Sequence, residues 1–136
     1  MELKLITGAF DVELPPLAPG DAMTGLPFGR RALAKHFHGP LEGTSRGEMI
    51  SWMTPVKGSA GYVAIEWVTA TLEGRDGSFA LQHSSTMRRG EPAQSIVVVP
   101  DSGSDGLAGL TGSMRIVIAP GGAHTYEFEY GFEAAP

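Results

Sequence analysis

Residues 62–83, YVAIEWVTATLEGRDGSFALQH, are the stretch that decides the fold. Two runs rich in β-branched and aromatic residues flank the segment GRDG at 74–77, and glycine accepts the positive φ that tight hairpin turns require. The stretch therefore predicts one long β-hairpin. Its two arms also carry Glu66, Gln82 and His83, which are polar groups among residues expected to be buried.

The turn decides which side chains share a face of this hairpin. If residues 75–76 form a two-residue loop, Glu66 and His83 lie on the same, core-facing side. If Gly77 is instead the αL residue of a three-residue loop, Glu66 lies on the opposite side from His83. His83 is expected to face inward in both alternatives, because the apolar positions of the second arm share its face.

Composition excludes several classes of protein. The chain has 136 residues, 42% hydrophobic and 18% charged, which predicts one globular domain over residues 1–136. The formal net charge of −5 argues against nucleic acid as a partner. Absence of cysteine excludes disulfides, thiolate metal sites and a cysteine nucleophile.

Location and partners follow from the same composition. The N-terminal sequence lacks the pattern of a signal peptide, and no apolar run approaches the length that spans a bilayer. We therefore expect a cytoplasmic protein with no membrane partner and no cofactor.

The rest of the chain predicts further short strands separated by turns. They lie at 3–14, 29–39, 42–54, 93–99, 114–119 and 125–133. The Pro- and Gly-rich residues 17–28 predict a long loop, of the kind that often forms a lid, and residues 84–92 predict a polar loop. The glycine-rich segment 100–112 allows a single helical turn at most, at 105–108.

About eight strands in meander order predict an eight-stranded antiparallel barrel, because closure hides the sheet edges. A two-sheet sandwich is the alternative architecture. The interior of an eight-stranded barrel is filled by side chains or holds one small ligand. In the last strand, an alternating aromatic row predicts core packing or, if exposed, a subunit interface; it consists of Tyr126, Phe128, Tyr130 and Phe132.

Four segments carry a resemblance to a known family: GPLEGTSRGEM (39–49), YVAIE (62–66), LEGRDGSFALQH (72–83) and VVVPDSGSDGLAGLTG (97–112). Together they resemble the bacterial domain of unknown function 3224 family, whose members are similar in fold to allene oxide cyclase and to calycin-like barrels. The resemblance implies the closed barrel and brings no established activity. None of the plant cyclase's functional residues is placed on this chain, since fold does not imply function.

The candidate site residues come from the chain itself. Glu66 and His83 are the candidate catalytic pair, because burial shifts carboxyl titration and histidine titrates near neutrality. The alternative is that both are hydrogen-bonded structural residues. Candidate ligand-binding residues are Tyr62, Phe79, Leu81, Gln82, His36 and His38.

The two histidines of the second strand are candidate metal ligands. His36 and His38 share a face of that strand and would suit a metal with a third ligand, such as His83 or His124. No third ligand has a suitable spacing in the sequence, so we expect no metal.

Two functions stay open. The first is a cofactor-independent isomerase or cyclase acting on a small apolar ligand in the barrel cavity. The second is a non-enzymatic binding or structural barrel, and a homo-oligomer is expected in either case.

Overall fold

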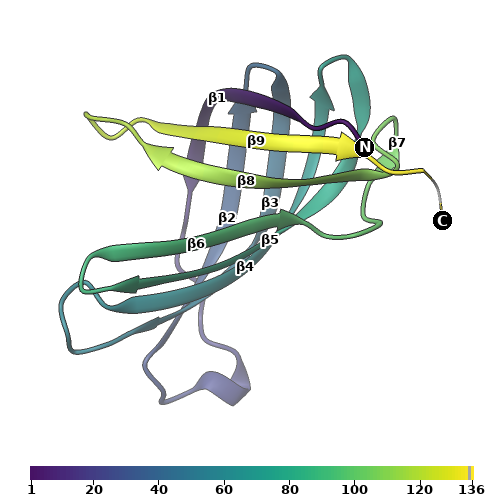
Figure 1. The fold of residues 1–136 in the computed structure, drawn as a ribbon. Helices are drawn as coiled ribbons and strands as arrows, with labels where there is room; N and C mark the ends of the chain where they lie inside the picture. The colour runs from purple at the N-terminus through teal and green to yellow at the C-terminus, as the bar shows by residue number, and fades with distance from the viewer. Residues whose placement is uncertain (135) are drawn as a thin grey trace.

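The computed structural model describes residues 1–134 and 136, and these residues form nine β-strands and one short 3₁₀ helix (Figure 1). The elements are β1 (Lys4–Glu13), η1 (Asp21–Met23), β2 (Phe28–His38), β3 (Leu41–Met53), β4 (Ala60–Leu72), β5 (Arg75–Arg88), β6 (Glu91–Val98), β7 (Ser104–Asp105), β8 (Leu110–Ile118) and β9 (His124–Phe132).

Eight of these strands close into an antiparallel barrel. Neighbouring strands pair in the order β4-β3-β2-β1-β9-β8-β6-β5, and pairing between β4 and β5 completes the ring. The two-residue strand β7 pairs with Gly77 and Ser78 of β5, on the part of the β5 edge that β6 does not reach. The predicted all-β, eight-stranded meander barrel is confirmed, and the sandwich alternative is not adopted. Within the described residues, no helix is long or apolar enough to cross a membrane.

The hairpin forms, but its turn lies two residues earlier than the predicted two-residue loop, and it is not the predicted three-residue loop. Leu72 pairs with Arg75, so the loop residues are Glu73 and Gly74, with φ of 45° and 89°. Positive φ at both positions is the geometry of a type I′ turn, which matches the twist of the flanking strands. The register is shifted from that of the predicted two-residue loop by an even number of residues, so the same side chains of β4 share a face with His83. Glu66 therefore faces inward, as that alternative required.

Strand β5 is longer than the sequence indicated. Residues 84–88 continue the strand, and the turn to β6 lies at Arg89 and Gly90, which have φ of 46° and 88°. The predicted polar loop at 84–92 is therefore wrong. These polar residues belong to a strand because the hairpin extends beyond the core, where side chains on both faces of the sheet are exposed or half-buried.

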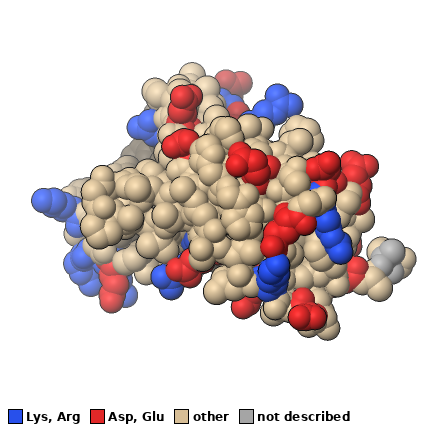
Figure 2. Space-filling view, turned by 90° about the horizontal axis from the view of Figure 1, so that it is seen from above, with Lys and Arg blue, Asp and Glu red and all other residues tan. Residues whose placement is uncertain are grey.

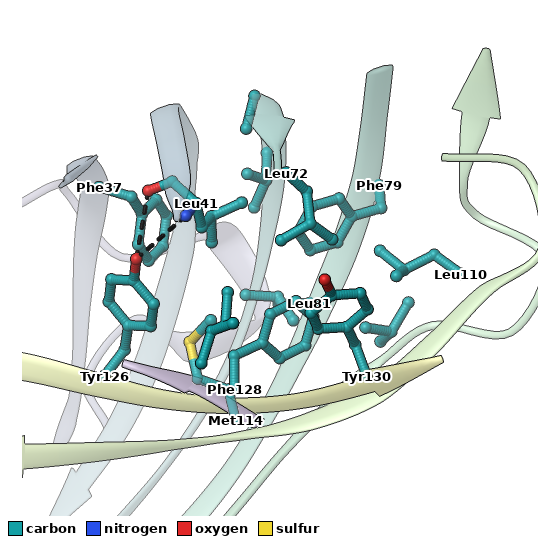
Figure 3. Packing of buried hydrophobic residues seen from close by; sticks show 14 of the residues in the cluster. Phe37, Leu41, Leu72, Phe79, Leu81, Leu110, Met114, Tyr126, Phe128 and Tyr130 are labelled. Atoms are coloured by element: carbon teal, nitrogen blue, oxygen red, sulfur yellow. Dashed lines mark hydrogen bonds between the residues drawn. The ribbon is translucent and has the colours of Figure 1, made fainter. Parts of the chain in front are cut away.

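The core fills the end of the barrel nearer the Glu73–Gly74 turn (Figure 3). Tyr126 and Phe128 of β9 are fully buried, and Tyr130 is 7% exposed, so the predicted core role of this aromatic row is confirmed. The hydroxyl of Tyr126 donates to the His38 carbonyl at 2.8 Å and accepts from the Leu41 amide at 3.2 Å. One aromatic ring thereby fixes the turn between β2 and β3 over the core.

The opposite end of the barrel is splayed. The β8–β9 hairpin diverges there from β4, β5 and β6 (Figure 1). The loop between β3 and β4 lies beside the turn between β5 and β6, where the Gly90 amide donates to the Gly58 carbonyl at 2.9 Å. β6 joins β8 through one ladder pair, Val97 with Ser113. Beyond that pair, the side-chain oxygen of Gln94 accepts from the Ile116 amide at 2.8 Å. A side chain thus replaces backbone pairing along part of this seam.

Charge is unevenly spread over the surface. Figure 2 shows one face on which uncharged side chains cover the middle, while acidic side chains gather on the side of the C-terminus. The net charge of −5 is therefore carried in part by this region rather than by a uniform shell.

Candidate functional site

Four polar side chains point into the barrel where the core meets the splayed end. They come from four successive strands: Lys35 from β2, Ser45 from β3, Glu66 from β4 and His83 from β5. The ladder pairs Lys35 with Ser45, and it sets Glu66 diagonally from His83, whose direct partner is Ala64. Alternation along each strand therefore brings all four to one layer, which we call the polar cluster.

The polar cluster is centred on the Glu66 carboxylate. Oε2 accepts from Lys35 Nζ at 2.8 Å and contacts His83 Nε2 at 2.6 Å, and Oε1 accepts from Ser45 Oγ at 2.8 Å. Glu66 is fully buried, and the other three side chains are 6% exposed or less. Carboxylate, ammonium, imidazole and hydroxyl thus form one connected network inside the barrel.

The network keeps Glu66 ionised. Burial alone would raise the pKa of this carboxyl, but the His83 hydrogen bond and the Lys35 charge outweigh burial and lower the pKa from 4.5 to about 2. The Lys35 ammonium also lies 5.1 Å from the ring centroid of Phe10 and 5.6 Å from that of Phe37. These aromatic faces supply further favourable contacts for the buried cation.

His83 has one ring nitrogen committed and one free. Nε2 contacts Glu66, and within the described residues His83 makes no second side-chain hydrogen bond. Among the residues that the structure describes, every fully buried side-chain nitrogen or oxygen has a hydrogen-bond partner. Nδ1 must therefore belong to the small exposed part of the residue, and it can accept a proton or a hydrogen bond.

Tyr62 lies next to the polar cluster on the same face of β4. Its ring centroid is 6.4 Å from that of His83. Burial raises the pKa of Tyr62, a contact with Ser85 opposes this, and the Glu66 charge adds to the increase. The phenol is therefore held neutral between the polar cluster and the splayed end.

The remaining candidate residues fall in three places. Phe79 and Leu81 are fully buried core residues. Gln82 is exposed on the outer face of β5, opposite Val97 of β6. His36 and His38 lie on the outside of β2, away from the barrel interior.

The outer histidines belong to a second, separate group. His36 Nε2 is 2.9 Å from Glu42 Oε2, and His38 Nε2 is 2.8 Å from Asp11 Oδ2. The hydrogen bond from His36 and the charges of both histidines lower the pKa of Glu42, although its own desolvation acts the other way. The structure therefore joins His36 to His38 and Glu66 to His83, and it does not bring the two groups together.

Two residues of the polar cluster were missed from the sequence. Lys35 stands between Leu33 and Phe37 at an inward position of β2, and Ser45 occupies the same kind of position on β3. A lysine within an apolar alternating row is the signal that could have identified it, since buried lysines need a partner.

The open pockets lie elsewhere on the surface. One, of about 540 Å³, is formed by the β5–β6 turn at 88–92. The other, of about 580 Å³, lies on the outer face of β3, β4 and β5 and includes Glu42, Trp67 and Asp76. Neither is lined by Glu66 or His83, so the polar cluster is enclosed by side chains rather than placed in one of these pockets.

Comparisons with known proteins agree with the fold. The family model described as "Protein of unknown function (DUF3224)" matches residues 6–130. A crystal structure of a DUF3224 family protein of unknown function from Shewanella oneidensis MR-1 is 49% identical, with a TM-score of 0.91, and the match covers 98% of this chain and 100% of that one. No curated protein matches. On the family match and on this identity over nearly the whole length, the chain belongs to the DUF3224 family.

Proposed function

We propose that the protein binds a small molecule at the splayed end of the barrel, against the polar cluster. The observation that carries the proposal is the enclosed network of Lys35, Glu66 and His83. Desolvating such charges costs several kcal/mol per ion, and apolar side chains of similar volume would often stabilise a barrel equally well. Buried charged groups with shifted pKa values concentrate at functional sites. A function therefore explains the presence of this network better than stability does.

The surroundings favour a mostly apolar ligand with one carbonyl or carboxylate oxygen. Half-buried Tyr62 lies between the cluster and the open end, and alternation places Met49 and Met87 on the same inner face. Methionine side chains change rotamer at low cost and can make room for an apolar body. The ammonium of Lys35 and Nδ1 of His83 would then meet the polar end of the ligand.

A cofactor-independent isomerase or cyclase is the second candidate, and the 2.6 Å contact between His83 and Glu66 favours it. A carboxylate that holds one imidazole nitrogen leaves the other to act as a base. His83 Nδ1 would remove a proton next to a carbonyl group, and Lys35 would stabilise the negative charge that develops on its oxygen.

Native mass spectrometry of the protein purified gently from its own host tests ligand binding. The expected result is a small-molecule adduct that is lost in Tyr62→Ala. The adduct should persist in Val63→Ala, which changes the opposite face of the same strand. A wild-type protein that carries no adduct, and whose Tyr62 and His83 resonances do not move in a fragment screen by nuclear magnetic resonance, would leave a structural barrel as the better explanation.

Deuterium incorporation separates the enzyme from the binding protein. A bound ketone should exchange its α-hydrogens with deuterium oxide if His83 acts as a base. His83→Gln should stop this exchange while the ketone still binds. Binding without exchange in the wild-type protein would reject the isomerase and keep the binding function.

A further inference from the structure

We infer that His36, His38 and Glu42 form a site for a divalent transition-metal ion on the outer face of the barrel. The three residues offer ligand atoms that all lie within 4.8 Å of one another. Their side chains are 51%, 43% and 53% exposed, respectively, so an ion can reach them from solvent. The site is independent of the proposed ligand site, because it faces outward while the polar cluster faces inward.

The atoms are already close to a coordinating arrangement. Glu42 Oε2 lies 2.9 Å from His36 Nε2 and 3.8 Å from His38 Nδ1. Zinc–ligand bonds of about 2.0–2.1 Å in a tetrahedral site imply spacings of roughly 3.4 Å between ligand atoms. Small side-chain rotations would therefore bring all three atoms into range of one ion.

Regular backbone holds the three residues. His36 and His38 are two apart on β2 and share a face, with their rings stacked at a centroid distance of 4.2 Å. Glu42 comes from β3 across the turn at Gly39, whose φ of +102° only glycine adopts readily. Sites on strands are positioned more accurately than sites on loops, which makes this arrangement suitable for an ion.

Asp11 gives a second, independent reason to expect a metal. Its Oδ2 lies 2.8 Å from Nε2 of His38, from the strand on the other side of β2. Metal-binding histidines usually donate their second ring N–H to a carboxylate, which fixes the tautomer. A neutral His38 that donates its Nε2–H to Asp11 presents an unprotonated Nδ1 on the side of Glu42.

The donor set indicates which ions would bind. Two imidazoles and one carboxylate suit Zn²⁺, Co²⁺, Ni²⁺ or Cu²⁺ better than Mg²⁺ or Ca²⁺, and they leave a coordination position for water. In the sequence, the histidines that could be the third ligand, His83 and His124, have no suitable spacing. Glu42 was missed because it follows the turn, on the neighbouring strand.

Metal titration of the full chain after chelator treatment tests the site. Calorimetry with Zn²⁺ and visible absorption with Co²⁺ should each show one equivalent per chain. His36→Gln, His38→Gln and Glu42→Gln should each weaken binding at least about tenfold, and Asp11→Asn about 10- to 100-fold with the stoichiometry kept. His124→Gln and Glu48→Gln are matched controls outside the cluster and should bind as the wild type does.

Nitrogen-15 spectra of the histidines add a readout specific to the geometry. Zn²⁺ should shift Nε2 of His36 and Nδ1 of His38, and it should leave His124 unchanged. The absence of saturable binding at one equivalent would overturn the proposal. So would unchanged affinity in the double variant of His36 and His38.

Discussion

At the scale of single residues, Glu66 determines the character of the barrel interior. Its carboxylate has three protein partners, and each of them is buried with it. Arg30 and Glu48 form an ion pair at 2.7 Å on the surface, where water screens it. The same type of contact therefore has very different consequences inside and outside the barrel.

Glu66→Gln is expected to destabilise the fold by about 3–5 kcal/mol at neutral pH. The change leaves the Lys35 charge buried without its counter-charge, which is the costly way to break a buried pair. Glu48→Gln, which breaks the surface pair, should cost about 1 kcal/mol or less. Urea unfolding measures both, and equal effects for the two variants would contradict this account.

The Glu66 pKa also predicts acid sensitivity. The folded pKa of about 2 lies below the ordinary 4.5, so ionisation of Glu66 stabilises the folded state fully above about pH 4.5. That contribution, about 3 kcal/mol, is lost as the pH falls through 2. The stability difference between wild type and Glu66→Gln should therefore shrink from pH 4.5 to pH 2. A difference that stays constant over this range would show that Glu66 is not held ionised.

At the scale of elements, the β4–β5 hairpin contains two glycines that are required for different reasons, one for its backbone conformation and one for a close contact. Gly74 has a φ of +89° and no heavy atom within 4 Å of an added Cβ. Gly77 has ordinary strand φ, but an added Cβ would overlap the Ser104 carbonyl oxygen of β7. The sequence predicts both glycines of GRDG in the turn, but only Gly74 belongs to it. Gly77 is needed for the close approach of β7, and the local sequence gives no sign of that contact.

Substitutions at the two glycines should act differently. Gly74→Val should lower stability by about 1–2 kcal/mol through αL strain. Gly77→Ala should displace β7 and shift the resonances of Ser104 and Leu107, which Gly74→Val should leave in place. Gly20→Val is the control, since Gly20 has a φ of −66° and open space around it. If Gly77→Ala left β7 unchanged, the close approach would not be the reason for this glycine.

The hairpin also shows how much of the site the sequence could predict. Alternation placed Phe79, Leu81 and His83 inward in any register, because these positions share one face. The position of Glu66 depended on the parity of the turn, which local sequence left open. Lys35 and Ser45 could not be assigned, since their meeting with Glu66 depends on the stagger between strands far from the turn.

At the scale of the whole molecule, the barrel was predictable because strand count and short turns leave few ways to hide sheet edges. The side chains that fill the barrel were harder to predict than the barrel itself. The sequence could not show that polar side chains occupy the boundary between core and splayed end, or that the two open pockets at the β5–β6 turn and beside Trp67 lie outside the barrel. Those features depend on how far each strand extends past its neighbours.

The expected homo-oligomer stays a prediction, and the outer face of β4 is its best support. Val63, Ile65 and Trp67 are 54%, 56% and 49% exposed there, respectively. Arg46 and Glu48 flank them on β3, and opposite charges side by side suit a two-fold contact with a second copy.

Sedimentation velocity should show the wild-type chain as a dimer or larger. Ile65→Glu should shift it toward monomer, because a charge in an apolar contact is desolvated without a partner. Ile118→Glu is the control, at a position 66% exposed on β8. A monomeric wild type at high concentration would contradict the prediction.

The pairing of β1 with β9 has a consequence for how the chain is made. About 110 residues separate the end of β1 at Glu13 from the start of β9 at His124. At 5–20 residues per second, a ribosome needs roughly 6–20 s to supply that partner. Until then one edge of β1 has no neighbour, and Ile6 and Phe10 lack the ring of side chains that buries them. We therefore expect the nascent chain to be open to chaperones while residues 14–123 are made, and to become protected in a single step once β9 is available.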